Sequence, residues 1–317
     1  MIMNEKHITT NSLKAWFLAA RPKTLSGAAV PVLIGMAFAY KDTGIDSFQI
    51  LPAILCLLFA WVMQIDSNFI NDYFDCIHGN DNKEKRLGPQ RACSEGWITL
   101  KAMKIGIAIT TVLGCFIGLP LIIYGGIEMI LVGAMCVLFA FLYTTKLSYL
   151  GLGDLLVLVF FGIVPVCLTY YVIMPDNGQT ITLEVFLASI SCGLVIDTLL
   201  LVNNYRDRDN DKRDGKNTLV VRIGEKATEK VYYSVGIVAA LIMSIIQQNN
   251  IYNYNDIWIK CIPTGVFLIY FVLHTMTWRR MKKINHGKEL NKMLGQTSKN
   301  MIVFGILESL SIVITSL

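Results

Sequence analysis

Charged side chains are scarce in this sequence. Asp, Glu, Lys and Arg make up only 16% of the 317 residues, whereas hydrophobic residues make up 54%. An average soluble domain is about one quarter charged. This shortage excludes an ordinary soluble domain and predicts a protein that lies in a membrane.

Two other features are missing. The eight cysteines include no C-x-x-C pair and mostly fall in apolar runs, so we expect packing residues rather than a zinc site or a disulfide framework. The first 25 residues contain no apolar run long enough for a cleavable secretory signal. We expect residues 1–24 to be a cytoplasmic lead with a short interfacial helix over about residues 13–20.

What the sequence does contain is a series of long apolar runs. A helix needs roughly 20 largely apolar residues to cross a bilayer. Runs of about this length occupy residues 25–40, 50–70, 104–122, 126–143, 153–174, 184–202, 231–247, 257–276 and 300–317. We therefore predict an all-α, polytopic membrane protein with nine transmembrane helices in a single domain over residues 1–317.

Positive charge is nearly absent from one set of connections between these runs. With a cytoplasmic N-terminus, the outer connections contain only Lys41 and, at a helix start, Lys260. Cytoplasmic connections normally carry an excess of Lys and Arg, so the pattern predicts that orientation in a cell (inner) membrane. The net charge of +5 is then a topology signal, and the expected partner is a lipid bilayer rather than nucleic acid.

Acidic and amide side chains gather where the second and sixth apolar runs end. Asn71 and Asp75 are four residues apart in NDYFD, and Asn203, Asp207 and Asp211 repeat this spacing in NNYRDRDND. A spacing of four places side chains on one face of a helix. Each cluster is therefore predicted to point in a single direction.

A long connection follows each cluster, over about residues 77–100 and 205–230. The equivalent placement suggests two related halves, arranged as a parallel repeat around a shared site. In the first half, Gly79 stands four residues after Asp75, and the next acid is Asp81. Because glycine favours the end of a helix, we expect Asp81 to reach the site from the loop.

Carboxylates at this density repel one another unless a cation lies between them. Oxygen ligands suit a hard divalent ion, and Mg²⁺ usually shares its coordination shell with water and substrate phosphates. The arginine fork fits phosphate oxygens, and a polyprenyl diphosphate would match both the charges and the apolar spans. The basic residues on the same predicted side are Lys83, Lys85, Arg86, Arg91, Lys146, Arg206 and Arg208.

Chemistry follows from such a ligand. Metal and cationic groups stabilise charge on a departing diphosphate, which leaves an allylic carbocation that aromatic faces can stabilise. Each ring can equally be a packing residue. The aromatic candidates are Phe69, Tyr73, Phe74, Tyr143, Phe160, Phe161 and Tyr170.

A divalent-cation transporter is an alternative from another class, since acids at membrane depth also mark ion paths. An ion path should carry polar groups through the middle and the far side of the membrane. This sequence places few there, which favours the enzyme.

Four stretches together resemble the UbiA superfamily of intramembrane prenyltransferases, whose nine helices surround a central cavity. They are ARPKTLSGAAVPVLIG (20–35), NDYFDCIHGNDNKEKRLGPQRACSEGWIT (71–99), YLGLGDLLVLVFFG (149–162) and NNYRDRDNDKRDGKNTLVVRIG (203–224). The Asp-rich motif regions are then 71–91 and 203–224. HGND and RLGPQR look most like the branch that prenylates 1,4-dihydroxy-2-naphthoate, because relatives acting on 4-hydroxybenzoate or haem tend to keep a third acid four after the second and an RT…RP pattern.

The resemblance implies roles for individual residues. The Mg²⁺ diphosphate would be bound by Asn71, Asp72, Asp75, Asp81, Asn203, Asp207 and Asp211, of which Asp72, Asp75, Asp207 and Asp211 would be catalytic. Arg86, Arg91 and Lys146 would bind phosphate oxygens. Arg21 and Lys23 would contact the diphosphate or the acceptor carboxylate, or would only anchor the positive inner side.

Five further ionisable residues stay open. Asp66 and Asp197 lie deeper in their spans, where an ionisable residue is a functional candidate by default; each would orient the acceptor hydroxyl or hydrogen-bond between helices. Asp154 would cap a helix or line the acceptor cavity. We expect Asp256 to be solvated and His78 to be a bystander.

The resemblance thus implies a Mg²⁺-dependent enzyme that transfers a polyprenyl group from polyprenyl diphosphate to 1,4-dihydroxy-2-naphthoate. The acceptor carboxyl group would leave as CO₂, and the product would be a demethylmenaquinone. Another aromatic acceptor, such as 4-hydroxybenzoate, is the alternative within the class.

Overall fold

The computed structural model describes residues 8–79, 86–175, 178–252 and 256–316, with the Lys146 side chain left aside. Within these ranges the regular structure is helical, without strands. The first half contains α1 (Leu13–Ala20), η1 (Pro22–Thr24), α2 (Leu25–Ser47), α3 (Ile50–Ile77), α4 (Leu100–Gly118), η2 (Leu119–Leu121), α5 (Ile122–Gly125), α6 (Glu128–Leu142) and η3 (Tyr143–Leu147). The second half contains α7 (Gly153–Val157), η4 (Leu158–Ile163), α8 (Val164–Ile173), α9 (Leu183–Arg213), α10 (Leu219–Ile223), α11 (Glu225–Asn250), α12 (Ile257–Ile284) and α13 (Leu290–Ile314).

Nine stretches of the described chain are long and apolar enough to cross a membrane, which confirms the predicted polytopic, all-helical fold. Four of them combine more than one helical segment: α1 is followed by η1 and α2, α4 continues through η2 into α5, α6 into η3, and α7 through η4 into α8. The predicted short helix near the N-terminus is α1. Its N-cap is Ser12, whose side chain accepts a hydrogen bond from Ala15 N.

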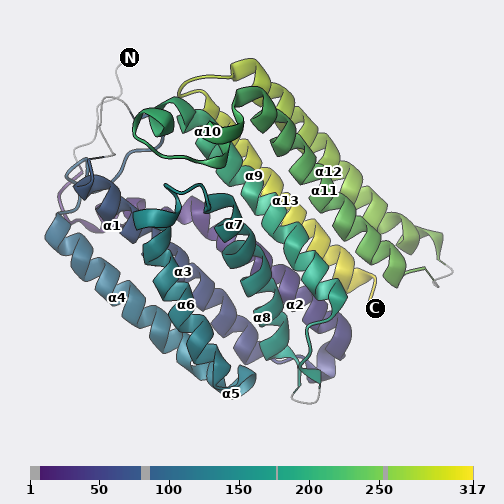
Figure 1. Ribbon diagram of the computed structural model, residues 1–317. Coiled ribbons are helices and arrows are strands. Elements are labelled where there is room, and N and C mark those ends of the chain that lie inside the picture. Colours follow the sequence, from purple (N-terminus) through teal and green to yellow (C-terminus); the bar gives the residue numbers. More distant parts are fainter. Residues whose placement is uncertain (1–7, 80–85, 176–177, 253–255, 317) are drawn as a thin grey trace.

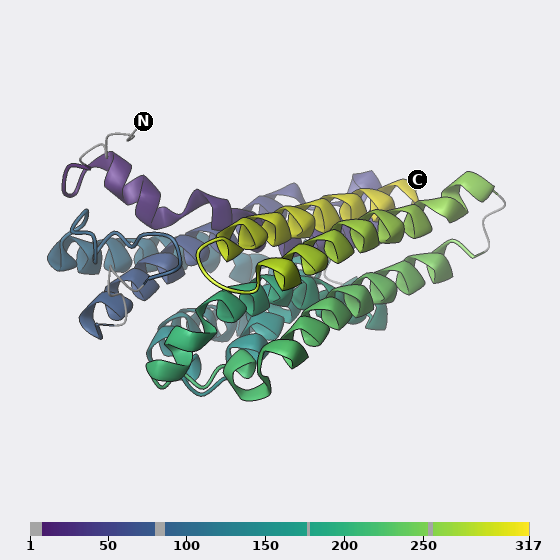
Figure 2. The ribbon, with the colours of Figure 1, turned by 90° about the horizontal axis from the view of Figure 1, so that it is seen from above.

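The helices lie side by side in one bundle (Figure 1). Figures 1 and 2 place α1 and α10 at one end of this bundle and the C-terminus at the other. The Asp-rich ends of α3 and α9 belong to the same end as α1 and α10, which we call the motif end.

The extent predicted for the second long connection, about residues 205–230, is wrong. Helix α9 continues to Arg213, α10 follows at Leu219, and α11 begins at Glu225, so most of residues 205–230 is helical. The predicted apolar run ended at residue 202 and the connection was expected from about residue 205, although the spacing of Asn203, Asp207 and Asp211 already placed those side chains on one helix face. Lys212 and Arg213 lie in the last turn of α9, where positive charge complements the helix dipole and supports a helix that extends beyond the apolar region.

Asp256 also has a role that the sequence prediction did not give it. It is the N-cap of α12, and its Oδ1 accepts a hydrogen bond of 2.8 Å from Trp258 N. An N-cap carboxylate satisfies one of the unpaired amides at a helix start. The predicted solvated acid therefore fixes the start of the eighth span.

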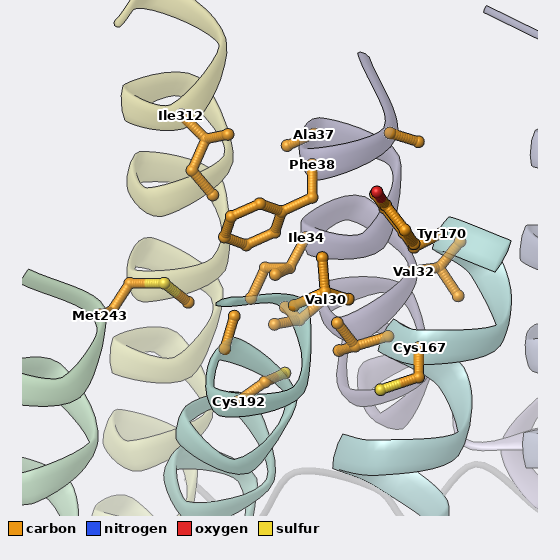
Figure 3. Close-up of a cluster of buried hydrophobic side chains, with 14 of the residues drawn as sticks. Val30, Val32, Ile34, Ala37, Phe38, Cys167, Tyr170, Cys192, Met243 and Ile312 are labelled. Atoms are coloured by element: carbon orange, nitrogen blue, oxygen red, sulfur yellow. The ribbon is translucent and has the colours of Figure 1, made fainter. Parts of the chain in front are cut away.

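Helix α2 lies at the centre of the packing. Its Val30, Ile34 and Phe38 face side chains from four other helices, among them Tyr170 on α8 and Met243 on α11 (Figure 3). Between helices in lipid, association depends on van der Waals packing and close backbone approach rather than on hydrophobic burial. Tight packing around α2 therefore holds the bundle together.

Gly35 is required for one of these close approaches. A Cβ atom at this position would lie 2.7 Å from the Val166 carbonyl oxygen and 2.9 Å from Thr169 Cβ. Small residues at such crossings let two backbones approach. The crossing of α2 and α8 fixes one wall of the cavity described next, because both Val32 and Thr169 line it.

Candidate functional site

A cavity of about 2330 Å³ lies inside the bundle. The charged and amide side chains that line its motif end include Arg21, Lys23, Asn71, Asp75, Arg86, Arg91, Asn203, Arg206, Asp207, Asp211 and Lys216. Its apolar lining includes Met129, Ile130, Val137, Phe139, Phe160, Phe161, Val164 and Leu168. Such a cavity fits a ligand with a charged head and an oily body.

The first Asp-rich cluster contributes Asn71 and Asp75, which share one face of α3 and both line the cavity. Asn71 Oδ1 accepts a hydrogen bond from Thr144 Oγ1 in η3. Asp75 Oδ2 accepts one of 3.3 Å from Arg91 Nη2. The predicted spacing of four thus places both side chains on the same wall, and Asp75 is already next to a cation.

Asp72 lies elsewhere. It is 1% exposed and does not line the cavity, because the next residue along a helix points about 100° away. Its two carboxylate oxygens accept hydrogen bonds of 2.9 Å from the backbone amides of Ala92 and Cys93. The metal-binding and catalytic roles predicted for Asp72 do not fit this geometry, in which Asp72 holds the returning loop against α3.

Other predicted residues lie outside the part of the chain that the structure describes. They are Asp81, Lys83 and Lys85, together with the side chain of Lys146. Their predicted roles stay predictions.

The second cluster lies on α9, and Asn203, Asp207 and Asp211 all line the cavity from one helix face. Arg206 is only 4% exposed. Its guanidinium donates hydrogen bonds of 2.5 and 2.9 Å to Asp207 and one of 2.9 Å to Asn203 Oδ1. The ends of α3 and α9 therefore meet at one site, as the sequence predicted.

Arg208, predicted to lie near the phosphate, points away from the cavity. It donates to the backbone carbonyls of Tyr205 and Asn285, and it pairs with Glu225 at 3.1 Å. Two residues along a helix differ by about 200° in direction, so Arg206 and Arg208 cannot face the same wall. Arg208 instead ties α9 to the starts of α11 and the α12–α13 turn.

Several cations line the motif end around these acids. Arg21 joins α1 to η1 in a left-handed conformation, with φ of 50°, and Asn68 on α3 fixes this turn by donating to Ala20 O and Thr24 Oγ1. Burial lowers the pKa of the Arg86 guanidinium, with Arg21 acting in the same direction and the Asp75 carboxylate opposing it. Arginines gathered in this way favour an anion between them.

Two residues that line the cavity, Lys216 and Asn291, were not predicted from the sequence. Lys216 lines the cavity near Asp75 and Asp211. It lies in the stretch DGKNT of the second Asp-rich motif region, which could have identified it, but no role was predicted for it. Asn291 at the start of α13 also lines the cavity and accepts a 2.8 Å hydrogen bond from Arg206. Nothing in the sequence around Asn291 distinguishes it.

Three of the seven predicted aromatic residues, Tyr143, Phe160 and Phe161, line the cavity. Tyr143 begins the π-helix η3, and the two phenylalanines belong to the π-helix η4. The wider turn of a π-helix is frequent at functional sites. Phe139, which was not predicted, packs at a tilt against Phe160 with ring centroids 4.9 Å apart.

The other four predicted aromatic residues, Phe69, Tyr73, Phe74 and Tyr170, are not part of the cavity wall. Phe69 packs edge-on against Trp16, with centroids 5.3 Å apart, and the Tyr170 hydroxyl donates to Asp42 at 2.7 Å. These rings are packing residues, which was the alternative left open. Closeness to the motif in the sequence could not distinguish cavity-lining rings from packing rings, because the orientation of each helix about its own axis decides which ring faces inward.

The deeper acids divide in the same way. Asp66 does not line the cavity; its oxygens accept hydrogen bonds from Thr110 at 2.5 Å and Thr111 at 2.9 Å, which links α3 to α4. Its geometry therefore favours the interhelical role over substrate binding. Asp154 lines the cavity, and its carboxyl group contacts that of Asp197 on α9. His78, whose ring is tilted relative to the Phe74 ring with centroids 6.0 Å apart, is not part of the wall.

The donor set can be compared with the needs of Mg²⁺. The described residues contain no group of three or more His, Cys, Asp or Glu side chains able to hold a metal by themselves. Asp75, Asp207 and Asp211 nevertheless line one cavity together with several cations. Mg²⁺ commonly takes one or two carboxylates and completes its shell with water and phosphate oxygens, so these residues fit a metal that arrives with a diphosphate.

Fold and site together define a polytopic helical membrane protein with a cavity that is charged at one end and mostly apolar along the rest. A family model, the UbiA prenyltransferase family, matches residues 28–293. The chain belongs to this family.

Individual relatives agree with the assignment. The chain is 32% identical to 1,4-dihydroxy-2-naphthoate octaprenyltransferase of Escherichia coli (strain K12), over 98% of both chains. It is 36% identical to the protein of the same name from Haemophilus influenzae, over 70% of this chain and 73% of the relative. A UbiA homolog from Archaeoglobus fulgidus, bound to GPP and Mg²⁺, has the same fold, with a TM-score of 0.60 at 15% identity over 93% of this chain and 99% of that one.

Proposed function

We propose that this protein transfers a polyprenyl group from polyprenyl diphosphate to 1,4-dihydroxy-2-naphthoate, with loss of CO₂, to give a demethylmenaquinone in its reduced, quinol form. Membership of the UbiA prenyltransferase family supports the reaction class. The names of the relatives from Escherichia coli and Haemophilus influenzae support the acceptor. The family also disfavours the divalent-cation transporter considered from the sequence.

The observation that carries the proposal is the meeting of two Asp-rich helix faces at the charged end of an apolar cavity. Asp75 comes from α3, and Asp207 and Asp211 come from α9. A diphosphate head suits this end, and a prenyl tail suits the aromatic and aliphatic remainder.

The residues at the motif end have distinct tasks in this proposal. Arg21, Arg86 and Arg91 bind phosphate oxygens in the fork geometry that arginine favours, and Lys216 adds charge beside Asp75. Asn71, Asp75, Asn203, Asp207 and Asp211 hold Mg²⁺, with Asp81 as a further candidate. When bound, Mg²⁺ supplies positive charge that stabilises the diphosphate as it departs.

The cavity wall beyond the motif end surrounds the prenyl cation and the aromatic acceptor during carbon–carbon bond formation. Breaking the bond between the prenyl carbon and the diphosphate oxygen leaves an allylic cation, which Tyr143 and Phe160 shield from water and stabilise through their ring faces. The electron-rich naphthoate ring then forms the new carbon–carbon bond. The acceptor's carboxylate leaves as CO₂, and the electron pair of its broken carbon–carbon bond restores the aromatic ring, so the immediate product is the quinol.

We also propose a location. The excess of Lys and Arg on one set of connections supports an orientation with the N-terminus and the motif end in the cytoplasm. The membrane would be the cell (inner) membrane.

An acceptor panel tests the proposal. Purified protein in lipid, given labelled polyprenyl diphosphate and Mg²⁺, should prenylate 1,4-dihydroxy-2-naphthoate faster than 4-hydroxybenzoate or other aromatic acids. Equal or faster use of 4-hydroxybenzoate would contradict the proposed acceptor and support the alternative within the class.

A further inference from the structure

Two acids lie side by side in the wall of the cavity, away from the Asp-rich motifs. Asp154 stands in the first turn of α7, and Asp197 lies on α9, six residues before Asn203. At 1.5 Å per residue along the helix axis, Asp197 lies roughly 9 Å farther from the motif end than Asn203. The pair is therefore deeper in the bundle than the diphosphate end.

The two carboxyl groups are in hydrogen-bonding contact with each other. Two ionised carboxylates would repel, so this contact requires a proton shared between them. Asp197 is only 7% exposed. Neither acid has an ion-pair partner among the described residues, so a salt bridge does not account for their burial.

The two acids have few other polar partners. Apart from the contact between the two carboxyl groups, the buried atoms Oδ1 of Asp154 and Oδ1 of Asp197 have no hydrogen-bond partner in the described part of the chain. A buried polar atom left unpaired costs about 1–3 kcal/mol. Apolar side chains would stabilise a purely structural contact between α7 and α9 without this cost, so the burial of two acids here needs another explanation.

The surroundings of Asp154, the member of the pair that lines the cavity, indicate what kind of ligand would bind there. Asp154 lines the cavity, as do Ile196 and Leu200, which flank Asp197 on α9. Tyr143 lies close by, since a Cβ atom on Gly153 would be 3.8 Å from the Tyr143 hydroxyl. A flat ring lying here would contact apolar side chains on its faces and an acid at its edge, and the matching edge group is a hydroxyl donor.

We infer that the Asp154–Asp197 pair binds a ring hydroxyl of the aromatic acceptor. Asp154 accepts the hydrogen bond from the hydroxyl, and Asp197 is a positioning residue that holds Asp154 through the shared proton. The inference rests on the proposed function, because it places the acceptor ring between this pair and the reacting prenyl carbon near Tyr143. A site built around such a hydrogen bond rejects analogues that lack the hydroxyl.

The test compares acceptor affinity between variants. Asp154→Leu should raise KM for 1,4-dihydroxy-2-naphthoate by about tenfold or more, the factor expected for loss of a hydrogen bond to a charged group. KM for polyprenyl diphosphate should stay within about twofold, since the motif end is untouched. Asp154→Asn keeps an accepting oxygen and should restore part of the affinity; Asp197→Asn should give an intermediate loss.

Ligand analogues separate direct contact from a structural effect. In the wild type, 1-hydroxy-2-naphthoate and 4-hydroxy-2-naphthoate should differ as competitive inhibitors, because only one retains the bound hydroxyl. Asp154→Leu should abolish that difference. Asp66→Asn, a buried acid outside the cavity, is the matched control and should keep both acceptor KM and the difference.

The outcomes distinguish the inference from the proposed function. If the wild type prenylates the naphthoate and Asp154→Leu and Asp154→Asn both keep its KM and the analogue preference, the inference is wrong while the function stands. If the wild type uses another aromatic acid, the same KM comparison with that acid decides the inference. If the wild type uses no aromatic acceptor, both fail. Size-exclusion profiles in detergent identify any variant that fails to fold, and the remaining Asp154 variant then decides.

Discussion

Arg206 on α9 and Asn291 on α13 are joined by a hydrogen bond of 2.8 Å, in which the guanidinium donates to the amide oxygen. Asn291 in turn donates to the Leu87 carbonyl at 2.7 Å. Because Arg206 also binds Asp207, the second Asp-rich motif, the last span and the loop of the first motif form one hydrogen-bonded unit. Gly88 is part of it, since a Cβ there would lie 2.9 Å from Arg206 Nη2.

Replacing Asn291 by Ala should therefore weaken a site to which it contributes no charge. Arg206 would lose a partner and the Leu87 carbonyl would lose its donor, at about 1.5–3 kcal/mol for a hydrogen bond to a charged group. We expect kcat/KM for polyprenyl diphosphate to fall about tenfold, measured by steady-state kinetics. Lys292→Ala, an adjacent and exposed position on α13, is the control; equal effects of the two substitutions would contradict the linkage.

Asp72→Asn should release the loop that Asp72 holds. Burial and the nearby Asp72 charge raise the pKa of the Cys93 thiol above its ordinary value, so little reactive thiolate forms in the wild type. With one charged acceptor removed, we expect maleimide modification of Cys93 to become about tenfold faster or more, as followed by peptide mass spectrometry. Cys261, which is exposed, should label equally in both proteins. A Cys93 that stays protected would show that Asp72 does not hold the loop.

Asp75→Asn and Asp207→Asn should each remove the charge that one helix face offers to the metal-bound diphosphate. We expect kcat/KM to fall by about a hundredfold or more without loss of folded protein, measured by prenyl transfer and by size exclusion. Asp209→Asn is the control on α9, because its side chain is 76% exposed and it should keep wild-type rates. Near-normal activity of either Asp75→Asn or Asp207→Asn would remove that residue from the site.

Chelation addresses the metal directly. Because the described residues do not form a complete cage, the metal should bind weakly to the free protein and EDTA should abolish turnover at once. Added Mg²⁺ should restore the rate to its starting value. Turnover that continues in excess EDTA would contradict the proposed Mg²⁺ dependence.

The sequence predicted the number of spans and the meeting of two helix faces, because apolar length and a spacing of four are properties of a single helix. It could not decide which way neighbouring residues point. Asp72 and Asp75 belong to the same motif, yet only Asp75 lines the cavity. Likewise, Asn291 reaches the site through the tertiary arrangement of α13 and α9, which no local pattern reports.

The extension of α9 beyond its apolar run was only partly predicted. The spacing of four placed the second cluster on one helix face, but a connection was expected from about residue 205. Residues 203–213 are polar but remain helical, and this extension carries Asp207 and Asp211 on the same face as Asn203. The pairing of Asp154 with Asp197 also needed the structure, because the two acids lie on different spans and share no motif.

The most direct test of the account follows both substrates at once. The purified protein in lipid receives polyprenyl diphosphate labelled in its tail and 1,4-dihydroxy-2-naphthoate labelled in its carboxyl group, with Mg²⁺. We predict that one CO₂ is released for each prenylated naphthalene formed and that no carboxyl label remains in the product. A prenylated product that retains the carboxyl label, or diphosphate release without any prenylated naphthalene, would contradict it.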